Sequence, residues 1–326
     1  PKPVAEAEAA PAAAAAPSVA EAKMALLRHA ATTDRGQLLF NQAAYAPLDE
    51  YSAEEASAAR AAIDALVDAR AGAPVDEALV DGEWELVFAT KQLFRSSPFF
   101  MAIEAAFGEG THSSFLSDNK EVLSSELFFR LHELQVKSFG ASTVGKVKQR
   151  IDIGASSLVS SFDTILFALT TVPIIGFGKL LPTFGGRVIT YADSLSASHD
   201  ETGALQLTMQ VDRTQVVEQQ GIPKPPFPLP QLLDVEWPVR NVWKVLPWND
   251  GKDPDCSTKV VYCDDDFRIN MDIRDSYFVY MRTGGAAPSP GDGSDAGDEA
   301  TTAPGGGAAA VVDEVEMRPV GTTADE

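Results

Sequence analysis

The side chains best suited to acid–base or nucleophilic chemistry are scattered along this chain. The histidines are His29, His112, His132 and His199, and they show neither an HExxH spacing nor a nearby cysteine. The serines that follow His112 lack the Gly-x-Ser-x-Gly turn that exposes a catalytic nucleophile. We therefore predict that the chain has no catalytic residue and is not an enzyme.

The carboxylates give no metal-binding pattern either. Asp264-Asp265-Asp266 is the densest group, but the Asp and Gly spacing of a calcium loop is missing, which favours a turn. Asp152, Asp163 and Asp193 lie far apart in the sequence, and whether they meet in space stays open. Gly176-Phe177-Gly178 lacks a preceding strand and a following helix, so it does not indicate a nucleotide site. We expect no metal ion.

The chain has only two cysteines, Cys256 and Cys263. Two thiols cannot build a disulfide scaffold or a four-thiolate zinc site. Two possibilities stay open at this point: a single bridge between them, or two reduced thiols on neighbouring strands.

The charge of the chain argues against a nucleic-acid partner. Its net charge is −21 with a pI near 4.5, and no basic stripe offsets that field. Residues 284–326 contain nine acidic residues and one basic residue, and this Gly/Ala/Pro-rich acidic tail is predicted to be disordered. Residues 1–20, rich in Ala, Pro and Glu, form a second predicted disordered segment. The start at Pro1 instead of Met suggests that a targeting segment has been removed.

The elements that position these residues begin with a predicted helical pair in residues 21–76. The first helix places Met24, Leu27 and Ala31 on one face. The second is predicted at Ser52–Arg70, and the two helices together are expected to pack as a lid, with a partner-binding face as the alternative. The second helix opens with a capping box at Ser52 and Glu55, and its apolar stripe consists of Ala56, Ala59, Ile63, Leu66 and Val67.

Residues Asp81–Phe107 organise the rest of the chain. Trp84, Leu86 and Phe88 alternate with less apolar residues, the period-2 pattern of a strand with one dry face. Ser97-Pro98 then marks the start of a strongly apolar helix, which is well placed to plug one end of a barrel.

A further helix and six further strands are predicted after that plug. The helix is expected at Lys120–Phe139. The strands are expected at Gly145–Ile153, Arg187–Asp193, Ala204–Thr214, Thr258–Cys263, Phe267–Met271 and Ser276–Arg282.

Residues Ser156–Gly186 are interpreted as an apolar excursion from the sheet. No charged residue occurs from 164 to 178, yet the uninterrupted run is shorter than the roughly 20 residues of a membrane-spanning helix. Two interpretations stay open. One is a buried loop with a short helix, and the other is a surface that contacts lipid or another hydrophobic protein through Ile174, Ile175 and Phe177.

A Pro-rich connector at Pro223–Pro230 precedes three tryptophans, Trp237, Trp243 and Trp248. Tryptophan is enriched at protein interfaces and in the headgroup layer of membranes. These side chains are therefore candidate contacts to a membrane or to a partner protein. Burial of all three inside the fold would argue against that role.

Four motifs in combination resemble the plastid-lipid-associated protein, or fibrillin, family. They are Leu79–Phe88 (LVDGEWELVF), Arg95–Phe100 (RSSPFF), Thr258–Asn270 (TKVVYCDDDFRIN) and Phe278–Tyr280 (FVY), with Asp34-Arg35-Gly36 matching the entrance to the family's domain. The resemblance covers roughly residues 22–283. The chain departs from the family at Asn270-Met271-Asp272, where a Ser-Arg-Gly-like turn is usual, and in the longer apolar segment 164–186.

This resemblance implies a mainly β protein with one domain at residues 21–283. The domain would contain the helical pair at 21–76 and, at 79–283, a lipocalin-like antiparallel β-barrel with its plugging helix. The family further implies residence in a plastid (chloroplast), at the periphery of the thylakoid membrane or of plastoglobules. It implies the binding of a lipid, quinone or carotenoid instead of catalysis.

A lipocalin-like barrel also implies roles for single residues. A late arginine stacks on the tryptophan of the Gly-x-Trp opening and closes the barrel floor, a cation–π contact worth about 0.5–2 kcal/mol. Trp84 is that tryptophan, Arg268 is the first candidate arginine and Arg282 is the second. The candidates for lining an internal ligand cavity, each of which can instead simply fill the core, are Phe88, Val188, Leu207, Met209, Phe267 and Ile269.

Two other functions compete with a carrier of hydrophobic ligands. The first is a structural or assembly subunit that docks on a photosystem or light-harvesting complex through the apolar excursion and the tryptophans. The second is an enzyme that acts on a carotenoid or quinone, which would require at least two titratable groups that converge in the cavity.

Overall fold

The computed structural model describes residues 17–39, 50–70, 72–107, 129, 143–166, 184–219, 221, 235–245 and 251–283. The predicted acidic tail and residues 1–16 of the predicted lead-in lie outside these residues. The lead-in prediction is wrong at its end, because a helix already begins at Val19. Ser18 caps that helix, and its hydroxyl and amide form a reciprocal pair of hydrogen bonds with Glu21. Of the predicted helix at 120–139, only Phe129 is described, and it is helical and buried.

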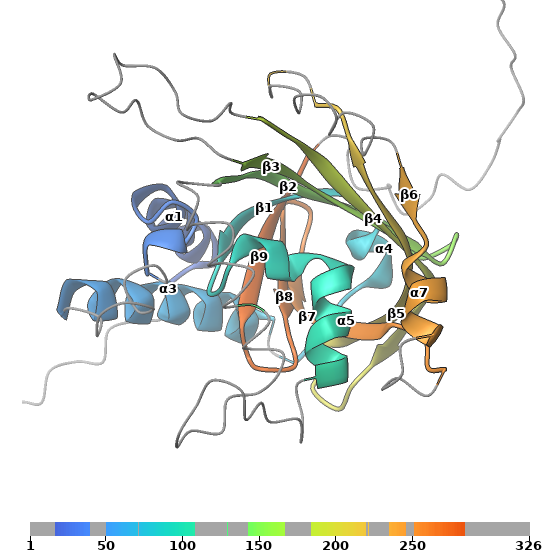
Figure 1. Cartoon of the computed structure of the whole chain (residues 1–326). Coiled ribbons are helices and arrows are strands. Elements are labelled where there is room, and N and C mark those ends of the chain that lie inside the picture. Colours follow the sequence, from blue (N-terminus) through green and yellow to red (C-terminus); the bar gives the residue numbers. More distant parts are fainter. Residues whose placement is uncertain are drawn as a thin grey trace, which may run out of the picture. The chain divides into compact units, whose positions relative to one another are not determined.

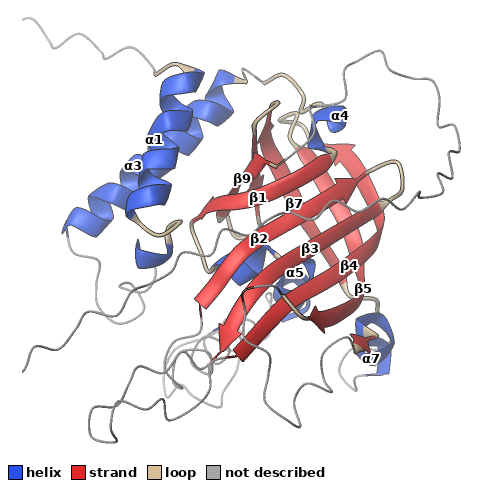
Figure 2. Cartoon of the chain, turned by 90° about the horizontal axis from the view of Figure 1, so that it is seen from above, coloured by secondary structure: helices blue, strands red, loops and turns tan. Residues whose placement is uncertain are grey.

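Helices α1 (Val19–Thr32) and α3 (Glu50–Ala69) pack against each other beside the sheet (Figure 2). The buried side chains of α1 include Ala22 and Leu26, whereas Met24 is 52 % exposed. The predicted apolar face of α1 is therefore wrong. Small residues such as Ala22 let two helices approach closely. The face with Ala22 and Leu26 therefore packs against α3, although the predicted face with Met24 has the larger side chains.

Helix α3 buries the stripe that the sequence predicts. Ala59, Ile63 and Leu66 are almost completely inaccessible. The predicted start is wrong, because α3 begins by Glu50 and Ser52 lies inside the helix. None of the helices in the described ranges is long and apolar enough to cross a membrane.

The protein is mainly β, and the nine strands of the described ranges form one antiparallel sheet. The hydrogen-bonded order is β4-β3-β2-β1-β9-β8-β7-β5-β6, and a further pairing of β4 with β5 closes the sheet into a ring (Figure 1). Only the two-residue β6 stands outside this ring, added to β5. The strands are β1 (Gly82–Ala89), β2 (Thr143–Asp152), β3 (Ser157–Leu166), β4 (Phe184–His199), β5 (Leu205–Val217), β6 (Glu236–Trp237), β7 (Asp255–Cys263), β8 (Phe267–Met271) and β9 (Tyr277–Arg282).

Strand β3 corrects the prediction of an apolar excursion over 156–186. The first part of that segment pairs with β2 along almost its whole length, and the last three residues already belong to β4. Leu158, Ser160 and Phe162 of β3 face inward, and Ser161 and Asp163 face outward. Because the inward Ser160 is polar like its outward neighbours, the sequence does not show the alternation of a strand. Residues 167–183 lie outside the described ranges.

The strands pack two separate apolar clusters, one on each face of the ring. The inner cluster lies inside the ring, and the outer cluster lies between α1, α3 and the outer face of β1, β7, β8 and β9. Period-2 alternation along each strand sends neighbouring residues to opposite clusters. The inner cluster includes Trp84, Leu86, Phe100, Leu207, Met209 and Phe278, and the outer cluster includes Leu26, Ile63, Leu66, Phe88, Phe267 and Val279.

Three short helices of the described ranges flank the strands. They are α4 (Glu77–Val80) before β1, the 3-10 helix η1 (Leu93–Ser96) after it, and α7 (Val239–Val245) after β6. Helix α5 (Pro98–Phe107) begins at the predicted proline and packs against the inner face of β4, β5 and β7. In Figure 2 it lies on the side of the sheet opposite to α1 and α3.

Glu104 ties α5 to its surroundings by ion pairs. This carboxylate is 2 % exposed and lies 2.9 Å from Arg274, 3.3 Å from Arg95 and 3.9 Å from Lys91. Burial raises the pKa of Glu104, and the neighbouring Asp272 adds to that rise, while the three cations oppose it. Charged contacts thus connect the plug helix to the turns at one end of the ring.

The turn Asp34-Arg35-Gly36 fastens the helical pair to the sheet. All three residues have positive φ, and Arg35 donates hydrogen bonds to the carbonyls of Val144 and Gly145, at 2.9 and 2.6 Å. A Cβ atom on Gly36 would lie 2.1 Å from the carbonyl oxygen of Ala89. Only glycine fits this close approach of the turn to β1.

Candidate functional site

One end of the ring is closed around Trp84. The indole Nε1 donates a hydrogen bond to the Val80 carbonyl at 2.9 Å, which holds α4 across the opening. The Arg282 guanidinium lies 4.2 Å from the indole ring centre and donates to the carbonyls of Leu79 and Asp81, at 2.5 and 2.7 Å. Arg282, the second candidate from the sequence, therefore links Trp84 to the backbone at the end of α4.

Arg268, the first candidate, also contacts Trp84 but lies deeper inside. Its guanidinium is 5.0 Å from the Trp84 ring centre and 4.3 Å from that of Tyr280. Its Nη2 donates to Oε1 of Gln149 at 2.5 Å, and Gln149 donates in turn to the Ser96 carbonyl at 2.8 Å. Complete burial lowers the pKa of Arg268 to about 10.

Several buried polar atoms near Arg268 have no hydrogen-bond partner. They are Nε and Nη1 of Arg268 itself, the Tyr280 hydroxyl, the Ser160 hydroxyl and Oδ1 of Asn270. Each of these residues is no more than 1 % exposed. Burial raises the pKa of Tyr280 to about 12, although Arg268 and Ser96 oppose the rise. Buried polar atoms are normally paired, so this concentration singles out the region as a candidate binding site.

The predicted cavity lining divides between the two faces of the sheet. Leu207 and Met209 belong to the inner cluster, and the half-buried Val188 packs against it. Phe88, Phe267 and Ile269 belong to the outer cluster under α1 and α3, so for these three residues the prediction is wrong.

Two physical reasons account for this correction. On β8, Arg268 points inward, and strand alternation then forces Phe267 and Ile269 outward. On β1, the register shifts between Leu86 and Phe88, and this bulge turns Phe88 to the outer face although Trp84 and Leu86 face inward.

The residues considered for catalysis or metal binding are not brought together. Within the described ranges no group of three or more His, Cys, Asp or Glu side chains has a metal-binding arrangement. Asp163 pairs with Arg187 at 2.7 Å, Asp193 pairs with Arg240, and Asp152 bonds the Ala155 amide at 2.7 Å.

The described histidines also have separate partners. Nδ1 of His29 lies 2.6 Å from Glu55, which joins α1 to α3. Nε2 of His199 lies 2.8 Å from the Val75 carbonyl. His112 and His132 lie outside the described residues. The Asp264 carboxylate accepts hydrogen bonds from the amides of Asp266 and Phe267, which is the predicted turn.

Both cysteines are free thiols. They lie at opposite ends of β7, seven residues apart on an extended strand, which places them far beyond disulfide distance. The expectation of neighbouring strands is therefore wrong. Burial raises the pKa of both thiols, that of Cys263 to about 12, so neither is a reactive thiolate near neutral pH.

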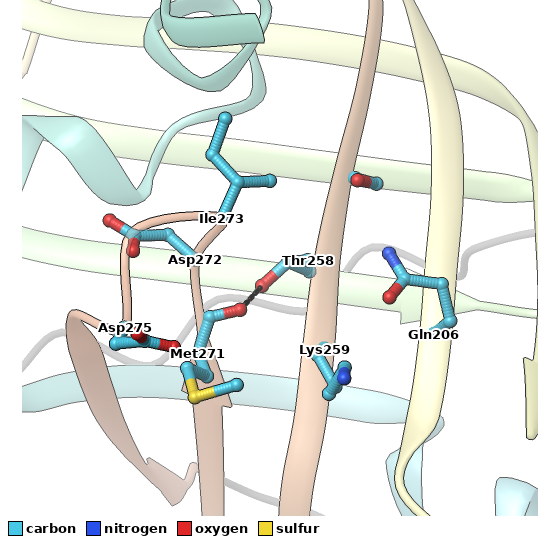
Figure 3. A pocket seen from close by; sticks show the side chains of 8 residues that line it. Gln206, Thr258, Lys259, Met271, Asp272, Ile273 and Asp275 are labelled. Carbon is cyan, nitrogen blue, oxygen red and sulfur yellow. Dashed lines mark hydrogen bonds between the residues drawn. The ribbon is translucent and has the colours of Figure 1, made fainter. Parts of the chain in front are cut away.

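A separate pocket of about 320 Å³ opens between β5, β7 and β8 (Figure 3). It lies where β8 leaves β7: their pairing ends at Lys259 and Met271, and the Thr258 hydroxyl donates to the Met271 carbonyl at 3.3 Å. Lys259, on its wall, is paired with Asp200 at 2.7 Å. The lining is mainly polar, and Asp272 on the same wall lies 3.8 Å from Lys91. Its lining is Gln206, Ser257, Thr258, Lys259, Met271, Asp272, Ile273 and Asp275.

The three candidate tryptophans differ in their environment. Trp237 is 50 % exposed, whereas Trp243 is 7 % exposed and packs 6.2 Å from the ring of Phe107. Trp243 is therefore a core residue, and its assignment as a membrane or partner contact is wrong. Trp248 and the apolar residues Ile174, Ile175 and Phe177 lie outside the described ranges.

Comparisons of the chain with protein-family models, with curated proteins and with solved structures find no match. Function is therefore inferred from the motifs of the sequence and from the geometry of the ring.

Proposed function

We propose that this chain is a non-catalytic protein of the plastid-lipid-associated, or fibrillin, type, which binds a hydrophobic small molecule inside a lipocalin-like barrel. The ligand is a lipid, quinone or carotenoid, and the place of action is the surface of thylakoids or plastoglobules. The observation that carries the ligand-binding proposal is the closed ring, whose wall is complete from strands alone and whose inner face is largely apolar.

Helix α5 fills the ring without being part of its wall. Strand pairing alone closes the ring, and α5 contacts the inner apolar cluster through side chains such as Phe100, Met101 and Ile103. Apolar packing and the ion pairs of Glu104 hold α5, so a shift of the helix along the sheet exchanges these side-chain contacts and breaks no ladder hydrogen bond. We propose that α5 shifts to admit the ligand against Val188, Leu207 and Met209.

The test is to purify the protein from its native membrane under mild conditions and to analyse its organic extract by mass spectrometry. A Val188→Trp variant narrows the inside of the ring at a position that is only half-buried. Ile189→Trp, one residue further along β4 and facing the other way, is the matched control.

We expect a stoichiometric lipid, quinone or pigment in the wild type and in Ile189→Trp, and its loss in Val188→Trp. No bound ligand in any of the three folded proteins would contradict the carrier function.

A second candidate function is docking on a photosystem or light-harvesting complex, and the segment β6–α7 favours it. Trp237, Val242 and Val245 are 50 %, 51 % and 77 % exposed, while Val239 and Trp243 on the other side of α7 are buried. A short segment with apolar residues on both sides leaves one side for a partner.

Docking predicts co-purification with a pigment–protein complex that depends on this segment. Trp237→Ser combined with Val242→Ser is expected to abolish co-purification. Ile273→Ser, which removes an equally exposed apolar residue at 53 % on the β8–β9 turn, is expected to leave it intact. Equal co-purification of both variants would contradict docking through β6–α7.

A further inference from the structure

Arg268 is a buried charge without a counter-ion. No carboxylate of the described ranges forms an ion pair with Arg268, and the neighbours with the largest effect on its pKa are Tyr280, Cys263 and Arg282. Two of these groups are neutral near pH 7, and the third is another cation. Burying a cation in this way is costly unless an anion or a set of acceptors compensates for the lost water.

The local protein contacts compensate for this charge only in part. Gln149 accepts one hydrogen bond, from Nη2, and the faces of Trp84 and Tyr280 give cation–π contacts. Nε and Nη1 remain without acceptors. A buried water molecule can accept hydrogen bonds from such atoms, but it does not neutralise the charge.

Arg268 is not needed to close the floor of the ring. Arg282 already lies nearer to Trp84 and holds α4 through two backbone carbonyls. Arg282 thus already fills the structural role beside Trp84, and the buried charge of Arg268 is not needed for it.

Two hydroxyls, those of Tyr280 and Ser160, also lack a well-formed hydrogen bond, and the Tyr280 hydroxyl has only Arg268 and Ser96 as polar neighbours that affect its pKa. Tyr280 is directly opposite Arg268 on β9, and Ser160 is directly opposite Gln149 on β3. Directly opposite residues of paired strands face the same side of the sheet, so both hydroxyls lie inside the ring. The charge, the free guanidinium donors and the hydroxyl donors together match an anionic acceptor such as a carboxylate.

We propose that Arg268 and Tyr280 bind the carboxylate of a long-chain fatty acid whose hydrocarbon chain lies inside the ring. This inference rests on the proposed carrier function and names the head group of the ligand. The carboxylate accepts hydrogen bonds from the guanidinium and from the Tyr280 hydroxyl, with Ser160 one strand beyond Gln149. The chain follows the apolar inner wall toward Leu207 and Met209.

The test compares two probes with the same hydrocarbon chain, oleate and the uncharged oleyl alcohol, by calorimetric titration of the delipidated full chain. Tyr280→Phe and Ser160→Ala remove one hydroxyl each and keep the side-chain shape. Tyr191→Phe and Ser161→Ala are the matched controls, since both residues face outward on the neighbouring strands β4 and β3. Arg268→Met removes the charge at similar side-chain length.

We expect oleate to bind more tightly than oleyl alcohol, and Tyr280→Phe to weaken oleate on the order of tenfold. Arg268→Met is expected to abolish the preference for oleate and to leave oleyl alcohol unchanged. If Arg268→Met does not fold, the comparison of Tyr280→Phe with Tyr191→Phe still decides the question.

A second readout uses oleate labelled with carbon-13 at its carboxyl group. In the wild type, the guanidinium and the Tyr280 hydroxyl together should keep the bound carboxylate ionised to a lower pH than the guanidinium alone does in Tyr280→Phe. The chemical shift of the labelled carbon reports the ionisation state directly. Equal binding of oleate and oleyl alcohol, unaffected by Tyr280→Phe, would overturn the head-group site while leaving the carrier function in place. No binding of either probe to the folded wild type would overturn both.

Discussion

The two faces of strands β1, β7, β8 and β9 are packed in opposite ways. The outer face lies under α1 and α3, and no residue of its apolar cluster carries a buried polar atom without a partner in the described ranges. The inner face holds Arg268, Tyr280 and Asn270, all almost completely buried and all with unpartnered atoms. The same strands thus form a finished core on one side and an incomplete one on the other.

This difference separates stability from binding. A finished apolar core gains free energy from every buried methylene group, so substitutions there should change folding and little else. Unpartnered buried polar groups lower the stability of the empty protein, and proteins keep such groups mainly where they serve a function. The outer face is therefore expected to hold the fold together and the inner face to bind.

The largest expected effect comes from the outer cluster. Ile63 is completely buried between α3 and the sheet, so Ile63→Ala should lower the free energy of unfolding by about 2–5 kcal/mol. Urea denaturation measures this loss. The affinity for oleate should stay unchanged, and a parallel loss of affinity would contradict the separation of the two faces.

A smaller effect is expected at the attachment of α1 to the β7–β8 turn. Lys23 lies 2.6 Å from the Asp264 carboxylate, which also accepts a hydrogen bond from the amide of Phe267. Burial raises the pKa of Asp264, but these contacts together outweigh it and lower the pKa below 3.8. Asp264→Asn should therefore cost about 1–2 kcal/mol at neutral pH.

The pH dependence of that cost follows from the sign of the shift. The folded carboxylate binds fewer protons than the unfolded one, so its stabilisation is complete above the ordinary pKa of 3.8 and is lost as the pH falls through the lowered value. Urea denaturation from pH 7 to pH 2 should show a constant difference between the wild type and Asp264→Asn above pH 3.8, and a shrinking difference below it. Asp266→Asn, with a side chain that is 74 % exposed, is the control and should run parallel to the wild type.

The smallest expected effect compares one tyrosine from each face. The Tyr262 hydroxyl on the outer side donates a hydrogen bond to Asp264, whereas the Tyr280 hydroxyl on the inner side makes no well-formed hydrogen bond. Tyr262→Phe should therefore cost about 1 kcal/mol, and Tyr280→Phe should be neutral or slightly stabilising in the ligand-free protein. Thermal unfolding of the delipidated variants measures both, and an equal cost would erase the contrast between the two faces.

The sequence predicted the parts of the fold in which local signals agree with the tertiary structure. The alternation of Trp84 and Leu86, the proline at the start of α5 and the run that forms β5 all lie where expected. Trp84 also lies beside both candidate arginines, with Arg268 at 5.0 Å and Arg282 at 4.2 Å from its ring centre. These features depend on neighbours in the chain or on one strong motif.

The rest depends on contacts that no local pattern contains. The bulge after Leu86 sends Phe88 outward, and only the pairing of β1 with β9 reveals it. Phe267 and Ile269 could have been placed correctly, since an inward Arg268 excludes its two neighbours from the same face. The sequence could not have predicted that the hydroxyls of Tyr280 and Ser160 lack hydrogen bonds, because the partner of a buried hydroxyl comes from other strands.

Hydrogen–deuterium exchange with and without saturating oleate tests most directly whether the ring admits a ligand past α5. Ligand inside the ring should change the exchange of the α5 amides, from Phe99 to Phe107, and leave those of α3 unchanged. Unchanged exchange throughout α5 under saturating oleate, or changes confined to α1 and α3, would contradict binding inside the ring.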